Sequence, residues 1–383
     1  MKSKTMSNKS KITMKTFDLD HTLINLSNSV LKHFGVDPFH HTIKEIDDVL
    51  KNHQKVAVIL LDGLGTYIRK IHPYSARYLN EHFFLQICST FPPTTVAATN
   101  GFLSARYPIE TGWMSWTQYF PDYQKNINVF TNRENETNIL IKPKEENILS
   151  TYCAYENIIS LINKTNNKEI AKSIFPYPLD EKGPKNLREN RKAVKQFLND
   201  HERCFLYCYH TDPDNTIHHY GVNSYRVGHS IRKLVRYVKK LVNDHKDTLF
   251  LVIADHGLID VNYLDINDHP DLVNTLSQNM SMEKRCPTFF VKECQKDDFC
   301  ALFKKYYGEY FDLYSKQEVY DLKIFGEGKP HTYVDNFIGD FLAIAKDKQS
   351  IYDSKAPYCH LHKAAHAGGN KKESLIDISA FNI

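Results

Sequence analysis

Two adjacent hydroxyl side chains, Thr94 and Thr95, follow a Pro-Pro pair in the segment FPPTTVAATNG (91–101). Because the prolines fix the backbone and small residues follow, either threonine lies where the N-cap of a helix is expected. Taken alone, the segment favours a helix cap, which is a common role for threonine. The same position would also suit a nucleophile, and the rest of the chain must decide between the two roles.

Carboxylate and imidazole side chains occur together at two further places. In HTDPDNTIHHYG (210–221), Asp214 and His218 are spaced i, i+4, so one helical turn would bring both to one face as ligands of one metal. In the segment ADHG, Asp255 and His256 end an apolar run, and a buried carboxylate needs a partner or a metal. A capped helix start with a surface histidine and a simple Asp–His hydrogen bond are the alternatives left open.

Two other segments carry weaker signals. Asp62 ends the apolar run KVAVILLDGLG (55–65), a pattern that α/β folds also use for structural or nucleotide-binding roles. His362 and His366 lie in HKAAHAGG near the C-terminus, where a single histidine is more often a surface residue than a ligand. Neither segment identifies a site without the others.

Apolar runs place these acidic side chains at the ends of buried strands. The runs at 55–65, 203–214 and 247–257 are too apolar for surface loops, and each ends in acidic residues. Strands alternating with helices predict a doubly wound α/β fold, in which ligands bind beyond the carboxyl ends of the strands. The chain is also expected to form strands at 83–91, 286–292 and 340–346 and helices at 23–36, 96–107, 155–164, 185–199 and 225–245.

The composition is that of an ordinary globular protein. The 383 residues are 42% hydrophobic and carry a formal charge of +4, which argues against a nucleic-acid or anionic-membrane partner. The eight cysteines include no Cys-x-x-Cys pair, so we expect reduced thiols and a cytoplasmic location. Residues 1–16 are predicted to form a disordered tail, and no apolar run is long enough to span a bilayer. The sequence leaves the oligomeric state open.

The order of the candidate residues resembles the alkaline phosphatase superfamily, and specifically its type I phosphodiesterase / nucleotide pyrophosphatase family. Three segments carry this resemblance, which extends over most of the chain. FPPTTVAATNGFLSARYPIETGW resembles the nucleophile segment of the family, PDNTIHHYG its Pro-Asp-x-x-x-His-x-x-Gly segment, and ADHG its Asp-His-Gly segment. Aligned without a gap, the first segment places the family's nucleophile at Thr95.

The resemblance implies a fold and a metal centre. The fold would be a single alkaline-phosphatase-like domain over 17–383, with a mostly parallel central sheet, helices on both faces and a small lobe from insertions at about 120–200 and 260–335. Carboxylate and imidazole ligands without thiolate suit two Zn²⁺ ions, with Mn²⁺ as the alternative. One ion would be bound by Asp62, Asp255, His256 and the Thr95 oxygen, and the other by Asp214, His218 and His366, with Asp212 and His362 as rival ligands.

The implied activity is hydrolysis of a small phosphodiester or nucleotide, at a phosphodiester or pyrophosphate bond, through a covalent Thr95 intermediate. A metal-bound threonine oxygen is an accessible nucleophile, and a second ion can hold the phosphoryl and leaving oxygens. The serine and arginine of the alkaline phosphatases proper are not evident, which favours diesters over monoesters. A phosphatase, phosphomutase or phosphonate hydrolase of the same superfamily is the alternative, followed by a non-catalytic scaffold that binds phosphorylated ligands.

One position departs from the family pattern. In eukaryotic nucleotide phosphodiesterases an asparagine downstream of the nucleophile holds a phosphate oxygen, and this register falls on Trp116. Ser115 or Thr117 could replace that donor. The indole of Trp116 could bind substrate by stacking on a base or another flat group, or it could pack in the core; we expect core packing.

A rival interpretation comes from FDLDHTLI (17–24), which resembles the Asp-x-Asp-x-Thr motif of haloacid dehalogenase phosphatases. That motif would make Asp18 the nucleophile and Asp20 the acid of a Mg²⁺ enzyme. The motif should follow a buried strand, but the preceding segment NKSKITMKT is polar. The sequence therefore gives this alternative little support.

Overall fold

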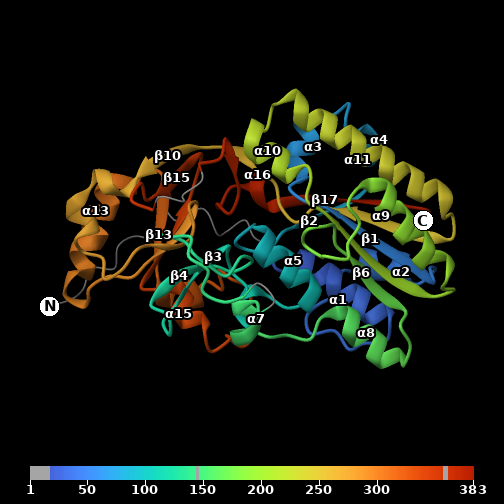
Figure 1. The fold of residues 1–383 in the computed structure, drawn as a ribbon, viewed down its shortest axis with the longest axis horizontal. Helices are drawn as coiled ribbons and strands as arrows, with labels where there is room; N and C mark the ends of the chain where they lie inside the picture. The colour runs from blue at the N-terminus through green and yellow to red at the C-terminus, as the bar shows by residue number, and fades with distance from the viewer. Residues whose placement is uncertain (1–17, 144–145, 357–360) are drawn as a thin grey trace.

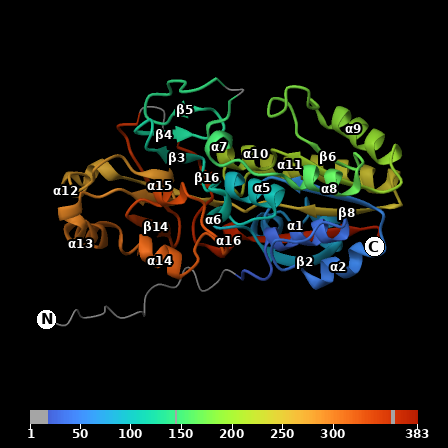
Figure 2. The same cartoon turned by 90° about the horizontal axis from the view of Figure 1, so that it is seen from below.

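Two lobes lie side by side along the long axis of the molecule (Figure 1), and a view from below separates them in the same way (Figure 2). The computed structural model describes residues 18–143, 146–356 and 361–383. The disordered tail predicted for residues 1–16 lies outside these described residues. One lobe holds a six-stranded sheet with its helices, and the other is built from smaller sheets.

The six-stranded sheet has the strand order β2-β17-β8-β1-β7-β6. β8, β1, β7 and β6 run parallel, and β17 runs antiparallel to β8 and β2. The middle strands are continuous apolar runs because both faces of the sheet are buried. The strands are β1 (Lys55–Leu61), β2 (Phe83–Cys88), β6 (Ala171–Ile174), β7 (Cys204–His210), β8 (Thr248–Ile253) and β17 (Leu375–Phe381).

Helices cover both faces of this sheet, as predicted (Figure 1). α1 packs against α2, α5 and α8 on one face, and α11 packs against α4, α9 and α10 on the other, which α3 joins through β17. The helices on the first face are α1 (Leu23–His33), α2 (Lys44–Leu50), α5 (Thr95–Ser104) and α8 (Ile158–Asn166). The helices on the opposite face are α3 (Thr66–Ile71), α4 (Arg77–Glu81), α9 (Leu187–Asn199), α10 (Asp214–Tyr220) and α11 (Tyr225–Asp244).

β6 and β17 were not anticipated from the sequence. β17 carries Asp377 and Ser379, polar residues that are buried and break the apolar run by which the other strands were found. Arg69 on α3 donates to the Asp377 carbonyl oxygen at 3.1 Å and to the Ser379 hydroxyl at 3.0 Å, and Thr66 donates to the Asp377 carboxylate at 2.7 Å. These hydrogen bonds offset the cost of burying the polar groups of β17, because each group keeps a partner.

The second lobe is built from short sheets joined by short helices. Its four-stranded sheet has the order β11-β12-β14-β13, and its three-stranded sheet the order β3-β4-β5. Residues 158–199, from the later part of the expected insertion at 120–200, instead form α8, β6 and α9 beside the central sheet. The strands of the second lobe and its junction are β3 (Thr117–Phe120), β4 (Lys125–Asn128), β5 (Arg133–Glu134), β9 (Ile259–Asp260), β10 (Asn262–Asp265), β11 (Ser281–Glu283), β12 (Cys286–Phe289), β13 (Phe311–Ser315), β14 (Phe341–Ala345), β15 (Gln349–Tyr352) and β16 (Ala364–Ala365).

The short helices complete the chain. They are α6 (Pro108–Thr111), α7 (Ile148–Tyr152), α12 (Pro270–Val273), α13 (Lys296–Tyr307), α14 (Lys316–Asp321), α15 (Val334–Ile338) and α16 (Lys371–Ser374). α13 is the longest of them and packs on α12 at the far end of the second lobe (Figure 1).

A shared hydrophobic core joins the two lobes. Phe91 and Val96, which flank the two threonines, are buried in one cluster with Phe325, Phe337 and Leu342 of the second lobe. The threonine segment is therefore held by apolar packing from both sides, which restricts its motion relative to the sheet.

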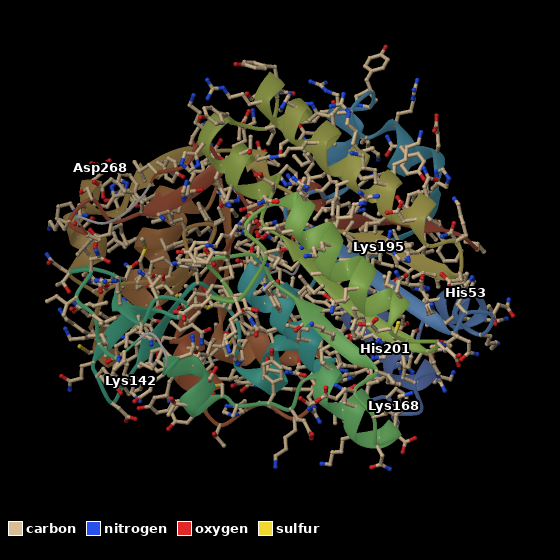
Figure 3. All side chains as sticks on the ribbon, turned by 45° about the vertical axis from the view of Figure 1, so that its right-hand side comes forward. His53, Lys142, Lys168, Lys195, His201 and Asp268 are labelled. Atoms are coloured by element: carbon tan, nitrogen blue, oxygen red, sulfur yellow. The ribbon has the colours of Figure 1, made fainter. Side chains whose placement is uncertain are left out.

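The placement of the basic side chains, the state of the cysteines and the character of the helices can be compared with the expectations from composition. Lys142, Lys168 and Lys195 lie at separate places on the molecule (Figure 3), so these basic groups are dispersed. Six of the described cysteines are free thiols: Cys88, Cys153, Cys204, Cys208, Cys286 and Cys294. Within the described ranges, no helix combines the length and the apolar character needed to cross a membrane.

The haloacid-dehalogenase-like segment forms a turn and a helix cap. The Asp18 carboxylate accepts from the Asp20 amide at 2.9 Å and contacts the His21 ring at 3.0 Å. Thr22 is buried and caps α1 together with Asn25. The Thr22 hydroxyl therefore caps a helix. This structural role accounts for the threonine of the Asp-x-Asp-x-Thr pattern without a catalytic function.

A buried ion pair ties the second lobe to the C-terminal segment. The Arg285 guanidinium donates to both Glu373 carboxylate oxygens at 2.7 Å and to the carbonyl oxygens of Gln349 and Asp347 at 2.9 and 2.8 Å. Glu373 also accepts from the Gly368 amide at 2.8 Å. Both side chains are fully buried, so each charge depends on the other.

We expect Arg285→Met to lower the free energy of unfolding by about 3–5 kcal/mol, because it leaves the Glu373 carboxylate buried without its cation. Urea unfolding followed by fluorescence measures this loss. Lys51→Met, which removes an exposed ion pair with Asp48, is the control and should produce no measurable change. An equal, small effect of both substitutions would show that the buried pair does not stabilise the fold.

Candidate active site

The candidate residues meet at the carboxyl edge of the central sheet. β1 lies between β7 and β8, with Leu61 paired to His210 and Leu60 paired to Ile253, so the segments that follow these strands converge. The Asp214 amide donates to the Asp62 carbonyl oxygen at 3.0 Å, which joins the start of α10 to the end of β1. Gly63 has φ +71°, and a Cβ there would lie 2.9 Å from the Asp214 Cβ, so this close approach requires glycine.

A first group of ligand atoms comes from Asp62, Asp214 and His256, whose side-chain atoms all lie within 4.8 Å of one another and are buried. His256 Nε2 lies 3.5 Å from Asp62 Oδ1 and 3.5 Å from Asp255 Oδ2. Asp255 Oδ1 accepts from the amides of Gly63 and His256, while its Oδ2 is buried without a hydrogen-bond partner among the described residues. An oxygen left in this state is available to a cation.

A second group comes from Asp214, His218 and His366, again within 4.8 Å of one another. His218 Nε2 lies 3.3 Å from Asp214 Oδ2, while its Nδ1 lies 2.7 Å from the Ala364 carbonyl oxygen and can donate to it. That hydrogen bond leaves Nε2 as the nitrogen that can ligate. Among the described atoms, Asp214 Oδ1 and His366 Nδ1 are buried and unpartnered. Asp214 therefore belongs to both groups, which the sequence did not predict.

The two rival ligands have other surroundings. Asp212 accepts from the Thr216 hydroxyl at 2.9 Å, as a residue at the start of a helix does. The His362 ring lies 4.5 Å from the His218 ring, tilted by 43°, and His362 lines the adjoining cavity. Burial, together with the charges of His218 and Lys284, lowers the pKa of His362 to about 4. The geometry thus favours Asp214 and His366 as members of the two groups.

The two threonines point to different partners. The Thr95 hydroxyl lies 3.1 Å from His256 Nε2 and 3.4 Å from Asp62 Oδ2, inside the first group. The Thr94 hydroxyl instead donates to Glu283 Oε1 at 3.1 Å. Although Thr94 occupies the N-cap position of α5, its side chain makes no capping hydrogen bond. Thr94 thus lies at the N-cap position expected from the sequence but does not cap the helix with its side chain, and the first amides of α5 remain available to an anion beside Thr95.

Buried like charges dominate the electrostatics of the first group. Burial and the negative charges of Asp255 and Asp214 raise the pKa of Asp62 well above its usual range, although a hydrogen bond from the Tyr209 hydroxyl opposes this effect. Burial alone would also raise the pKa of Asp214, but the charge of His218 and its hydrogen bond lower it. The mutual repulsion of three buried carboxylates is a cost that a bound divalent cation would relieve.

The imidazoles complement these carboxylates. Burial and the positive charges of His256 and His218 lower the pKa of His366 well below its usual value, so its ring is neutral at pH 7. A neutral ring offers a nitrogen lone pair, which is the form that binds metals. Oxygen and nitrogen donors, buried unpartnered atoms and excess negative charge together fit a divalent metal centre.

A cavity of about 420 Å³ opens beside Thr95 and is bounded by both lobes. Trp116 lines this cavity with 42% of its surface exposed, and its ring meets Phe130 edge-on at 5.3 Å. The expectation that Trp116 packs in the core is therefore wrong. Trp116 immediately precedes β3 of the second lobe, and no local sequence pattern reveals the position of that lobe across the cavity.

Asn128, Asn135 and Glu283 are among the cavity-lining residues that were not predicted. The Thr117 hydroxyl donates to Asn128 Oδ1 at 2.7 Å and lies 3.5 Å from Asn135 Oδ1, while Ser115 is fully buried. Glu283 Oε1 accepts from the Trp116 amide at 3.0 Å. These residues lie in segments with ordinary polar composition, so no sequence signal marks them.

Comparison with known proteins gives a family and a fold. Residues 56–369 match the family described as type I phosphodiesterase / nucleotide pyrophosphatase. The human ectonucleotide pyrophosphatase/phosphodiesterase 5 structure superposes with a TM-score of 0.62, and the murine one with 0.61. Each is 14% identical, and the alignments cover 86% of this chain and 88% of that chain. An inactive variant of the murine protein, in complex with AMP, matches equally well. A search of curated protein sequences gave no match. The predicted alkaline-phosphatase-like α/β fold is thereby confirmed.

We expect Asp62→Asn to increase the free energy of unfolding of the metal-free protein at neutral pH. Because the folded-state pKa of Asp62 is raised, its ionised form destabilises the fold as pH rises above the unfolded value of about 4. Asparagine carries no charge, so the gain should be small at pH 4 and should grow towards pH 8. Thermal unfolding in a chelator, across this pH range, measures it.

Asp260→Asn is the matched control, because the Asp260 carboxylate accepts from the Val222 amide outside both groups. Added zinc should stabilise the wild type more than Asp62→Asn. If zinc stabilised the wild type and Asp62→Asn equally, Asp62 would not be a metal ligand. If the stability gain of Asp62→Asn shrank as pH rises, the ionised Asp62 carboxylate would not destabilise the metal-free fold.

Proposed function

The chain belongs to the type I phosphodiesterase / nucleotide pyrophosphatase family, and from this membership we propose a metal-dependent hydrolase that cleaves phosphodiester or pyrophosphate bonds through Thr95. One observation carries the proposal. The Thr95 hydroxyl lies 3.1 Å from His256 Nε2, where two groups of buried carboxylate and imidazole ligands meet at the edge of the sheet.

The proposed metal ligands are those that the family resemblance implied. Their support is the shared Asp214, the unpartnered buried atoms and the absence of thiolates from both groups. Zn²⁺ suits these donors, and Mn²⁺ is the alternative. Divalent ions bound there would lower the pKa of the Thr95 hydroxyl and neutralise charge on the phosphoryl group. The ligands would be Asp62, Asp255, His256 and Thr95 for one ion and Asp214, His218 and His366 for the other.

The proposed reaction has two steps. The deprotonated Thr95 oxygen attacks phosphorus, the bond from phosphorus to the leaving oxygen breaks, and the leaving group departs with the electron pair. Water then attacks phosphorus, breaks its bond to the Thr95 oxygen and restores the hydroxyl. Asp62 and His256 hold the Thr95 oxygen in place, and the free amides at the start of α5 face the developing negative charge.

The proposed substrate is a small phosphodiester or a nucleotide. The murine ectonucleotide pyrophosphatase/phosphodiesterase 5 structure holds AMP, which supports this class for a chain with the same fold. The 420 Å³ cavity is large enough for a small ligand of this kind, and the exposed indole of Trp116 offers a flat apolar surface to a leaving group.

We expect Thr95→Ala to reduce hydrolysis of bis(p-nitrophenyl) phosphate by at least about a thousandfold while metal content stays largely intact, because the nucleophile is lost and the carboxylates and imidazoles remain. Release of p-nitrophenol, with chelator and zinc add-back, measures this. Thr99→Ala, one turn further along α5, is the matched control and should retain activity. Full activity of Thr95→Ala would move the nucleophile to Thr94 or exclude a covalent mechanism.

A further inference from the structure

A carboxylate, Glu283, lies on the cavity wall beside the threonine segment. The Trp116 backbone amide donates to Glu283 Oε1 at 3.0 Å. The same oxygen accepts from the hydroxyl of Thr94, the residue next to Thr95, at 3.1 Å. Two hydrogen bonds therefore fix the Glu283 carboxylate beside the threonine segment, on the wall of the cavity.

The backbone of β11 and the residues after it position the Glu283 side chain at the cavity wall. Glu283 ends β11, and the preceding residue, Met282, is buried with φ +66°, a conformation that non-glycine residues rarely adopt. Two residues further on, Arg285 is anchored to Glu373 by the buried ion pair. The hairpin that presents Glu283 is therefore held rigidly against the segment that carries His366.

Basic side chains share the cavity wall with Glu283. Arg285 lines the cavity, and its guanidinium donates to Glu373, Gln349 and Asp347. Lys284 also lines the cavity, and its charge acts on His362, as the charge of Glu283 acts on His218. The other charged groups on the described cavity wall, apart from the candidate ligands, are Glu136, Asp353 and His219.

We propose that Glu283 is a specificity-determining residue that selects phosphodiester monoanions and rejects phosphomonoester dianions. The proposal rests on the function proposed above. A diester carries one negative charge, whereas a monoester carries two above its second pKa of about 6. A carboxylate fixed by two hydrogen bonds beside the attacked phosphate repels the additional charge.

Glu283→Gln separates charge from hydrogen bonding, because the amide oxygen can still accept from the Thr94 hydroxyl and the Trp116 amide. We expect it to lower the ratio of kcat/KM for bis(p-nitrophenyl) phosphate over p-nitrophenyl phosphate about tenfold at pH 8, mainly by increasing the monoester rate. At pH 5, where much of the monoester is a monoanion, the variant should change the ratio less. An unchanged ratio at pH 8 would overturn the proposal.

Two control variants test whether Glu283 acts only as a structural brace, that is, by holding Thr94 and Trp116 in place through hydrogen bonds and not through its charge. Thr94→Val removes one hydrogen bond to Glu283 and keeps its charge, so the substrate ratio should stay near that of the wild type. Glu136→Gln removes another carboxylate of the same cavity, one that accepts from Asn126 Nδ2 at 2.9 Å. If Thr94→Val reproduces the change in Glu283→Gln, the residue is a structural brace and the proposal fails.

A binding measurement keeps the test independent of turnover. Inorganic phosphate, mostly a dianion at pH 8, should bind the metal-loaded Glu283→Gln protein about tenfold more tightly than the wild type, while dimethyl phosphate, a monoanion, should change less than about threefold. Wild-type protein that hydrolyses neither ester would refute the proposed function, and phosphate affinity would still decide the role of Glu283. Equal phosphate affinity in both proteins would overturn that role.

Discussion

Three carboxylates buried together at the ends of neighbouring strands are the constraint on which this structure depends. Asp62, Asp214 and Asp255 are buried together where their charges repel, and burial and the other two carboxylates raise the pKa of Asp62. Such an arrangement destabilises a fold unless a cation compensates it. The imidazoles of His256, His218 and His366 add nitrogen donors to these carboxylate oxygens, so the cluster is suited to divalent ions.

The rest of the molecule holds this strained cluster in place. The Glu373 backbone accepts from the Gly257 amide at 2.7 Å, beside His256, and its carboxylate accepts from the Gly368 amide, close to His366. Arg285 links the same glutamate to the second lobe, whose β11 carries Glu283 to the cavity wall. One buried ion pair thus joins both ligand groups to the surface that would contact substrate.

The sequence predicted the parts of the site that local patterns encode. Asp62 and Asp255 end apolar runs, and the spacing of Asp214 and His218 indicates one helical face, because strand burial and helical pitch are local properties. The sharing of Asp214 and the exposure of Trp116 depend on how distant segments pack, and no local signal carries that information. β17 was missed because the partners of its buried polar residues lie about 300 positions earlier in the chain.

The most direct test of this account is anomalous X-ray diffraction from a crystal grown with zinc. The account predicts two anomalous peaks roughly 4 Å apart. One peak should contact Asp62, Asp255, His256 and Thr95, and the other Asp214, His218 and His366. A single peak remote from Thr95, or no ion among the three buried carboxylates, would contradict the claim that their mutual repulsion builds a two-metal centre.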